Sequence, residues 1–155
     1  MRLDKKKVLK AFIKAQENKI QNLKNSLEMT RQHVIDAPGS NVSHSDTSKF
    51  QLSNVALGLD RQILEAKESL FYLRNIPIHQ DPAIRVGSFI RLKERVSDST
   101  TIYFLVDRGG GETVRVDELS VATLNIVTPL GRACLGKNDG DEVPYNKRVY
   151  VIENL

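Results

Sequence analysis

The chain has 155 residues, 40% of them hydrophobic and 27% charged, which is enough apolar material to build one folded domain or two small ones. No run approaches the roughly 20 apolar residues of a transmembrane helix, and the single cysteine, Cys134, excludes an internal disulfide and a cysteine-built zinc site. We therefore expect a cytoplasmic protein with no cofactor and no bound metal.

The positive charge is concentrated near the N-terminus. The net charge is +4, yet residues 1–36 alone hold nine Lys or Arg against four Asp or Glu. The candidates for facing nucleic acid are Lys5, Lys6, Lys7, Lys10 and Lys14. A basic helix face can bind the phosphate backbone of a transcript or of DNA, or an acidic partner. The commoner case is a solvated face that keeps the helix soluble, so the sequence leaves both interpretations open.

Apolar residues recur at spacings of three and four in two long segments. In the first segment the series is Leu9, Ile13, Gln16, Ile20, Leu23, Leu27, Thr30 and Val34, with two polar members. In the second it is Leu52, Ala56, Leu59, Ile63, Ala66, Leu70 and Leu73, flanked by Leu57, Leu64 and Phe71. Such heptad series predict two helices packed as an antiparallel coiled coil, which we expect to form a finger-like domain over residues 1–76.

A turn is expected at residues 37–49, between the two helical segments. Pro38 and Gly39 break the incoming helix, and the Ser, Asn and Asp residues that follow favour local hydrogen bonds. Ser48 and Gln51 have the spacing of a capping box, so the second helix is expected to resume at Phe50. The candidate contact residues at this tip are His44, Ser45, Asp46 and Lys49.

Residues 77–155 have a different pattern of apolar residues from the helical segments and are expected to form a second domain. Val, Ile, Thr and aromatic residues alternate in short runs separated by Gly and Asp turns, at residues 88–93, 101–106, 113–116, 121–126 and 148–152. These runs predict a small antiparallel sheet and hence an α+β protein. Residues 109–111 are three consecutive glycines, but no helix and no Lys-Ser or Lys-Thr follows them, so we expect a hairpin turn rather than a phosphate-binding loop.

One short helix is expected among these strands. Thr128 is a good N-cap, Pro129 suits the first helical position, and residues 130–135 carry the turns. Gly136 can adopt the left-handed conformation that ends a helix.

Residues 126–143 resemble the C-terminal signature of the bacterial Gre transcript-cleavage factors. They read IVTPLGRACLGKNDGDEV. The family signature is a Ser-Pro pair, a small-residue helix, Leu or Ile, Gly, Lys, two variable positions, Gly or Asp, Asp and Val. Residues 86–88 (Val-Gly-Ser), 110–112 (Gly-Gly-Glu) and 149–153 (Val-Tyr-Val-Ile-Glu) resemble the family as well. Because an N-terminal helical hairpin precedes the globular domain in Gre factors, the resemblance covers essentially the whole chain.

The resemblance implies an FKBP-like globular domain that docks on RNA polymerase at the rim of its secondary channel, and a coiled coil that enters the channel. The docking residues would be those of the short helix and its flanks, namely Thr128, Pro129, Leu130, Arg132, Gly136 and Lys137. It also implies a transcription elongation factor that regulates by binding and is not itself an enzyme. We expect it to be a monomer.

The tip departs from the family pattern. Gre factors carry an Asp and, three residues later, a Glu at the finger tip, which help to hold the second catalytic Mg²⁺ of the polymerase. Here Lys49 stands three residues after Asp46, and Asp36 lies before the Pro-Gly break. Because Mg²⁺ prefers several oxygen ligands in octahedral geometry, one carboxylate offers little hold. Taken with the resemblance, which implies polymerase binding, this tip predicts a factor that stimulates cleavage weakly or not at all.

The sequence also leaves a second class of function open, a structural or chaperone-like hairpin that binds another partner through its arms.

Other residues that could take part in catalysis or metal binding are weak candidates. His33, His44 and His79 are far apart in the sequence and are predicted to be solvated. His44 and Asp46 could bind a metal ion together, but two ligands make a poor site. Cys134 is predicted to be a small core residue.

Overall fold

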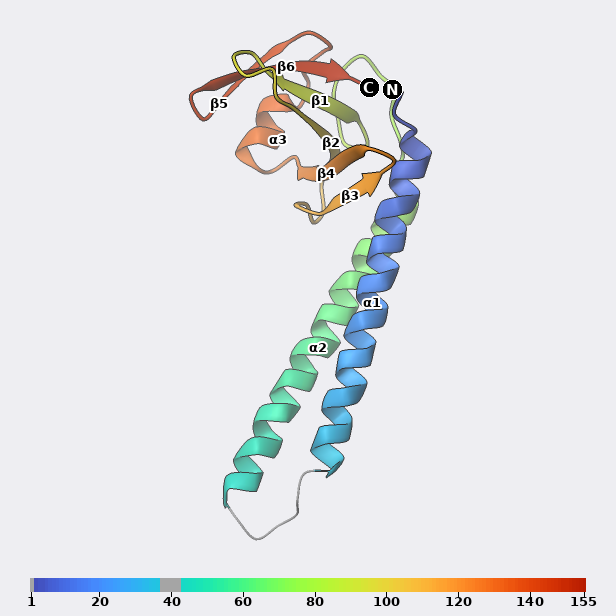
Figure 1. The fold of residues 1–155 in the computed structure, drawn as a ribbon, viewed down its shortest axis with the longest axis vertical. Coiled ribbons are helices and arrows are strands. Elements are labelled where there is room, and N and C mark those ends of the chain that lie inside the picture. The colour runs from blue at the N-terminus through green and yellow to red at the C-terminus, as the bar shows by residue number, and fades with distance from the viewer. Residues whose placement is uncertain (1, 37–42) are drawn as a thin grey trace. The chain divides into compact units, whose positions relative to one another are not determined.

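The structure is a computed structural model that describes residues 2–36 and 43–155, with the side chains of residues 36 and 43–46 outside the description. The helices are α1 (Lys5–Asp36), α2 (Ser43–Asn75) and α3 (Pro129–Cys134). The strands are β1 (Phe89–Glu94), β2 (Thr100–Val106), β3 (Thr113–Val116), β4 (Leu119–Asn125), β5 (Glu142–Tyr145) and β6 (Arg148–Asn154). Two long helices followed by a sheet with a short helix confirm the predicted α+β class (Figure 1).

The chain forms two compact units. One consists of residues 14–71, the greater part of α1 and α2, and the other of residues 1–13 and 72–155. The first turns of α1 and the last residues of α2 are thus part of the globular unit. The division into a domain of residues 1–76 and a domain of residues 77–155 stays a prediction, because compactness does not test which segments fold independently.

The helical unit buries the predicted heptad seam. Ile20, Leu27, Ile63 and Ala66 are at most 7% exposed, whereas members nearer the turn, such as Val34, are only half-buried. Amphipathic helices associate by removing such a stripe from water, so the periodicity of the sequence was sufficient to predict this pairing. No helix within the described ranges combines the length and apolar character needed to cross a membrane.

One polar member of the seam is fully enclosed. The Gln16 side chain is 2% exposed, and its amide nitrogen donates a hydrogen bond of 3.2 Å to the backbone carbonyl of Ala66 on the opposite arm. A buried amide that finds its acceptor in only one alignment of two helices favours that alignment. Gln16 therefore contributes to the register of the arms, although the sequence indicated only a weakened seam.

The second helix begins earlier than predicted. α2 starts at Ser43, so Ser48 lies inside the helix and is not its N-cap. The predicted turn of residues 37–49 is accordingly too long, since residues 43–49 are helical. Ser, Asp and Thr favour caps and turns, but inside a helix each costs only about 0.5 kcal/mol relative to alanine, so helix can propagate through them once the turns that follow have formed.

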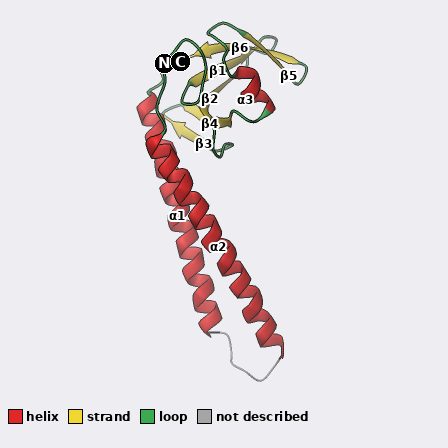
Figure 2. Cartoon of the chain, turned by 180° about the vertical axis from the view of Figure 1, so that it is seen from behind, coloured by secondary structure: helices red, strands yellow, loops and turns green. Residues whose placement is uncertain are grey.

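The sheet has the strand order β3-β4-β2-β1-β6-β5 (Figure 2). Most neighbouring strands are antiparallel, as predicted, but β2 and β4 are parallel, with Phe104 opposite Thr123, so the predicted antiparallel sheet is in fact mixed. The triple glycine is also not a hairpin turn, because β2 and β3 do not pair. Residues 107–112 instead carry the chain past the position of β4 to β3, which then returns along β4.

The strand β5 was not predicted. Pro144 lies within it, and proline lacks the N–H that a central strand must donate. β5 is the outermost strand on its side of the sheet and pairs only with β6, which is where proline is tolerated.

The two faces of the sheet bury two separate apolar clusters. Consecutive residues point to opposite faces of a strand, so Phe89 and Phe104 belong to one cluster and Ile90 and Leu105 to the other. Phe12 of α1 is fully buried in the first cluster, where its ring stacks on Phe104 with centroids 6.1 Å apart. Phe104 in turn stacks on Phe89 at 4.3 Å. The second cluster contains Cys134, which confirms the prediction of a core residue.

Replacing Phe12 with alanine should lower the free energy of unfolding of the globular unit by about 3–5 kcal/mol, because a large buried ring is removed from a packed cluster. All four tyrosines lie within residues 72–155, so tyrosine fluorescence during urea unfolding reports on this unit alone. Val96→Ala is the matched control, since Val96 is 92% exposed. Equal effects of the two substitutions would contradict the assigned role of Phe12.

Stability should also fall at alkaline pH through Tyr72. Burial, together with the Asp107 carboxylate, raises the pKa of Tyr72 from 10.0 to about 12, while its hydroxyl oxygen accepts a 3.0 Å hydrogen bond from the Asp107 N–H. The folded state therefore favours the neutral phenol, and the stability gained below pH 10 is lost as the pH rises toward 12. Tyr72→Phe should make that decline shallower in urea titrations at several pH values. Parallel stability curves for the two proteins would contradict this linkage.

Candidate functional site

The start of α3 is fixed by Thr128, as the sequence predicted. The Thr128 hydroxyl accepts a 3.1 Å hydrogen bond from the Gly131 N–H and donates one of 2.6 Å to the backbone carbonyl of Asn125. Pro129 occupies the first helical position. These bonds satisfy free backbone groups at the helix start and hold the entering chain in one conformation.

Two glycines are required by the path of the chain around α3. A Cβ on Gly131 would overlap the Asn125 carbonyl oxygen, so the helix can approach the end of β4 this closely only with glycine there. Gly136 has φ +77°, the predicted left-handed conformation, and its N–H donates a 2.8 Å hydrogen bond to the Ile84 carbonyl. The helix is therefore held to the sheet at one end and to the loop before β1 at the other.

Asn125 links α3 to the glycine loop, a role that could not be predicted from the sequence. Its side-chain amide donates to the Gly109 carbonyl at 2.7 Å and accepts from the Val127 N–H at 3.0 Å. Its backbone carbonyl also receives the two Thr128 hydrogen bonds. An asparagine at the end of a strand is common in turns, so only the fold identifies this one as the connection between two loops.

The predicted docking residues differ in exposure. Pro129, Arg132 and Gly136 are exposed, whereas Thr128, Leu130 and Lys137 are half-buried. Leu130 packs against the second apolar cluster, so a charge at this position would disturb the core as well as the surface.

Two exposed apolar side chains beside α3 were not predicted as docking residues. Val127 and Leu135 flank the helix and are 59% and 43% exposed. Together with Pro129 they give the helix an apolar border, and Arg132 adds a positive charge. Exposed apolar side chains that are grouped on one surface can mark a site of protein interaction.

An open hollow of about 500 Å³ adjoins this helix. Its wall includes the Thr128 and Leu130 side chains of the α3 region, the Tyr103 and Tyr145 rings and the glycines of residues 109–111. Burial is the main cause that raises the pKa of Tyr103, so its hydroxyl stays neutral to a higher pH than that of an exposed tyrosine. The hollow can accept an apolar side chain of a partner beside the exposed border of α3.

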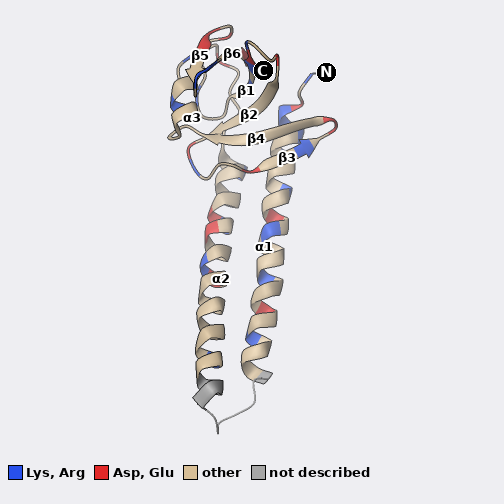
Figure 3. Ribbon diagram, turned by 60° about the vertical axis from the view of Figure 1, so that its left-hand side comes forward, with Lys and Arg blue, Asp and Glu red and all other residues tan. Residues whose placement is uncertain are grey.

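The five candidate lysines of α1 do not share one face. Lys6, Lys10 and Lys14 follow each other at intervals of four and are exposed, and the helical repeat sets them on the side of α1 away from the buried Val8 and Phe12. Figure 3 marks the Lys and Arg residues along α1 in blue. Lys7 is exposed too but forms an ion pair with Asp117. Lys5 is half-buried, and burial together with Arg2 lowers its pKa. The structure thus leaves Lys6, Lys10 and Lys14 as the coherent part of the predicted basic face.

Residues 37–42 of the predicted tip lie outside the described residues. No side-chain description covers His44, Ser45 or Asp46, which are at the start of α2, so their role as contact residues stays a prediction. Lys49 is within the described part and is half-buried. Across the described residues, no three His, Cys, Asp or Glu side chains are placed to hold a metal ion together.

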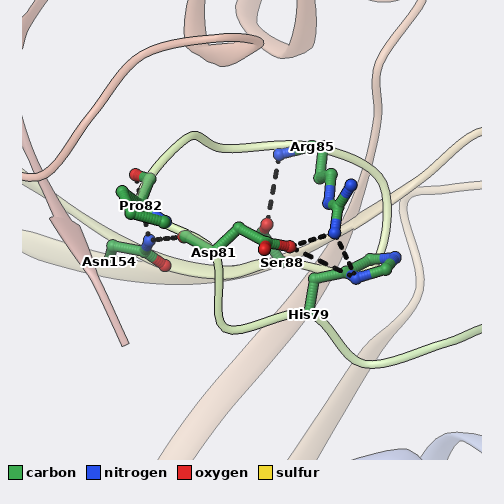
Figure 4. Close-up of polar contacts among 6 residues, drawn as sticks. All are labelled: His79, Asp81, Pro82, Arg85, Ser88 and Asn154. Carbon is green, nitrogen blue, oxygen red and sulfur yellow. Dashed lines mark hydrogen bonds and ion pairs between the residues drawn. The ribbon is translucent and has the colours of Figure 1, made fainter.

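His79 belongs to a polar network that orders the linker before β1 (Figure 4). Its Nδ1 lies 2.8 Å from the Arg85 guanidinium and 3.4 Å from the Asp81 carboxylate, and Arg85 and Asp81 also form an ion pair. The Asn154 amide donates to the Asp81 carbonyl at 2.7 Å. These interactions tie the linker to the last strand, so the histidine has a structural role and is only partly solvated.

Comparison with solved structures finds three that are similar in fold to this chain. The first is the transcription factor Gfh1, with 16% identity over 94% of both chains and a TM-score of 0.39. The second is GreA factor homolog 1 (Gfh1) of Thermus thermophilus, with 13% identity over 92% of both chains and a TM-score of 0.35. The third is Thermus aquaticus Gfh1, with 14% identity over 94% of this chain and 93% of that chain and a TM-score of 0.36.

Identities and TM-scores this low assign no function to the chain. At the level of sequence, no protein family and no curated protein matches it. The function of the chain must therefore be inferred from its own residues and their geometry.

If the basic face of α1 binds phosphate, Lys10→Gln combined with Lys14→Gln should flatten the salt dependence of binding to nucleic acid. The logarithmic slope should fall by roughly one for each lysine–phosphate ion pair that the substitutions abolish. Lys5→Gln is the matched control, because Lys5 is half-buried on the other side of the helix. A slope that is the same in all three proteins would leave the lysines with a role in solubility alone.

Proposed function

We propose that this protein is a Gre-like transcription elongation factor that binds RNA polymerase through its globular unit and places its helical hairpin in the secondary channel. It acts in the cytoplasm as a binding protein and catalyses no reaction itself. The observation that carries the proposal is the signature at residues 126–143, in which the positions resembling the Gre family are also the ones that shape α3.

The geometry of that signature supports the proposal. Thr128 caps the helix, Gly131 permits its close approach to β4, and Gly136 ends it in the left-handed conformation. A segment held at both ends presents its outer side chains without the entropic cost of ordering them on binding. Val127, Pro129 and Leu135 would supply the apolar contact and Arg132 a charge for the polymerase surface.

The composition of the tip supports a factor that occupies the channel without stimulating cleavage. Between residues 37 and 49 the only carboxylate is that of Asp46, among five Ser or Thr residues. Hydroxyl groups are poor substitutes for carboxylates as Mg²⁺ ligands, so this tip recruits an additional ion weakly. The protein would then compete with genuine cleavage factors for the channel.

Replacing Leu135 with aspartate should weaken polymerase binding by roughly tenfold or more, because a charge then enters an apolar contact. The side chain is 43% exposed, so the fold should survive, which circular dichroism checks. Val96→Asp is the matched control at a 92% exposed position in the turn after β1. Unchanged binding of a folded Leu135→Asp protein would remove α3 from the docking surface.

Adding the purified protein to halted elongation complexes should leave transcripts at full length in the presence of Mg²⁺, and Asp46→Asn should behave like the natural sequence. The reason is the shortage of carboxylates at the tip. Strong Mg²⁺-dependent shortening that Asp46→Asn abolishes would show that a single carboxylate suffices.

A further inference from the structure

A row of exposed apolar side chains runs along α2 within the helical unit. Phe50, Leu57, Leu64 and Phe71 follow each other at intervals of seven residues and are 68%, 67%, 59% and 72% exposed. We call these four residues the outer row. They are distinct from the seam that faces α1, whose members on α2 include the buried Ile63 and Ala66.

The spacing keeps the outer row on one side of the helix. Seven residues are almost two turns, so successive members are displaced by only about 20° around the axis. The row spans 21 residues, which is about 32 Å of helix. Soluble proteins rarely leave so long an apolar stripe in water unless another surface covers it.

The order of residues in the outer row is a palindrome. Phe, Leu, Leu and Phe read the same in both directions, with the midpoint between Asp60 and Arg61. A two-fold axis through that midpoint would set Phe50 against Phe71 and Leu57 against Leu64 of another copy. Two-fold interfaces require such a self-complementary patch.

The charges beside the row discriminate between the two possible directions of pairing. In the antiparallel arrangement Asp60 faces Arg61 of the other copy twice, while Lys67 faces Asn54. In a parallel arrangement each charged residue would face its own copy, which is unfavourable. The Asp60 carboxylate already accepts a 3.2 Å hydrogen bond from the Arg31 guanidinium. Because a carboxylate has further lone pairs, it can also accept a hydrogen bond from Arg61 of the other copy.

A groove beside the outer row offers a place for an inserted side chain. It has a volume of about 480 Å³ and lies between the arms, with Val34, Ile35, Ala56 and Leu57 among its lining residues. In the antiparallel arrangement Leu64 of the second copy lies opposite Leu57 and so reaches this groove. The Leu64 side chain would then insert into the groove, as in the knobs-into-holes packing of coiled coils.

We propose that the outer row is a self-association surface through which two copies of this chain pair in antiparallel fashion, with Asp60 and Arg61 at the centre. This inference departs from the monomer expected from the sequence. It is independent of the proposed docking through α3, because it concerns residues 50–71 alone. A pair of this kind would cover the hairpin and so hold the protein in a form that cannot enter a channel.

Sedimentation velocity of the full chain over a wide range of concentrations tests the pairing. The sedimentation coefficient should rise with concentration, and Leu57→Glu combined with Leu64→Glu should weaken association by on the order of a hundredfold. Val55→Glu is the matched control, because Val55 is 52% exposed and lies on another side of α2. Circular dichroism should show all variants folded, since every altered position is more than half exposed.

A single sedimenting monomer at all concentrations would overturn the proposal, as would an equal effect of Val55→Glu. Loss of polymerase binding in the Leu57→Glu, Leu64→Glu protein without any change in its sedimentation would instead mean that the row binds the polymerase. Because the α3 variants leave this row intact, failure of self-association and failure of docking are separate results.

The direction of pairing is tested by cysteine cross-linking. Phe50→Cys and Phe71→Cys should form a disulfide only when the two proteins are mixed, because each position lies about 32 Å from its own copy in the antiparallel pair. Cys134 is fully buried, so the unaltered protein is the negative control. Disulfides formed by either variant alone would indicate a parallel pair and overturn the proposed arrangement.

Discussion

The globular unit depends on one aromatic stack. Phe12 contributes a ring from the first turns of α1, and this ring packs on Phe104, which packs on Phe89 of the neighbouring strand. All three are fully buried, so the stack joins the start of the helix to the centre of the sheet by dispersion and apolar burial. Without the Phe12 ring, the beginning of α1 would pack on this cluster through Val8 and partly buried side chains such as Leu9 alone, and the sheet face opposite α3 would be less well covered.

The helical hairpin could be predicted from the sequence because its information is local and periodic. Ile20, Leu27 and Ile63 are buried where the heptad series places them. Strand pairing was harder to predict. Alternation locates a strand and its inward residues, but nothing in residues 107–112 specifies that the chain passes β4 before β3 forms, so the parallel pair of β2 and β4 was missed. β5 was missed because the meaning of Pro144 depends on its position at an edge.

Only part of the candidate site could be predicted from the sequence. Thr128, Pro129 and Gly136 follow the local rules for the ends of helices, and the structure places them accordingly. The exposure of Leu135 and the partial burial of Leu130 depend on how α3 lies on the sheet, which no local rule gives. The outer row is a third case. Leu57, Leu64 and Phe71 were identified as a series flanking the seam, but only the structure shows how far they remain in contact with water.

In the proposed function the short helix α3 docks on the polymerase, and the hairpin occupies space rather than supplying chemistry. Competition on halted elongation complexes tests this account most directly. Increasing amounts of the protein, added together with a genuine Gre cleavage factor, should progressively suppress transcript shortening, and the Leu135→Asp protein should suppress it much less. Undiminished cleavage at saturating amounts of the folded protein would contradict the account, because two factors that share one channel cannot both occupy it.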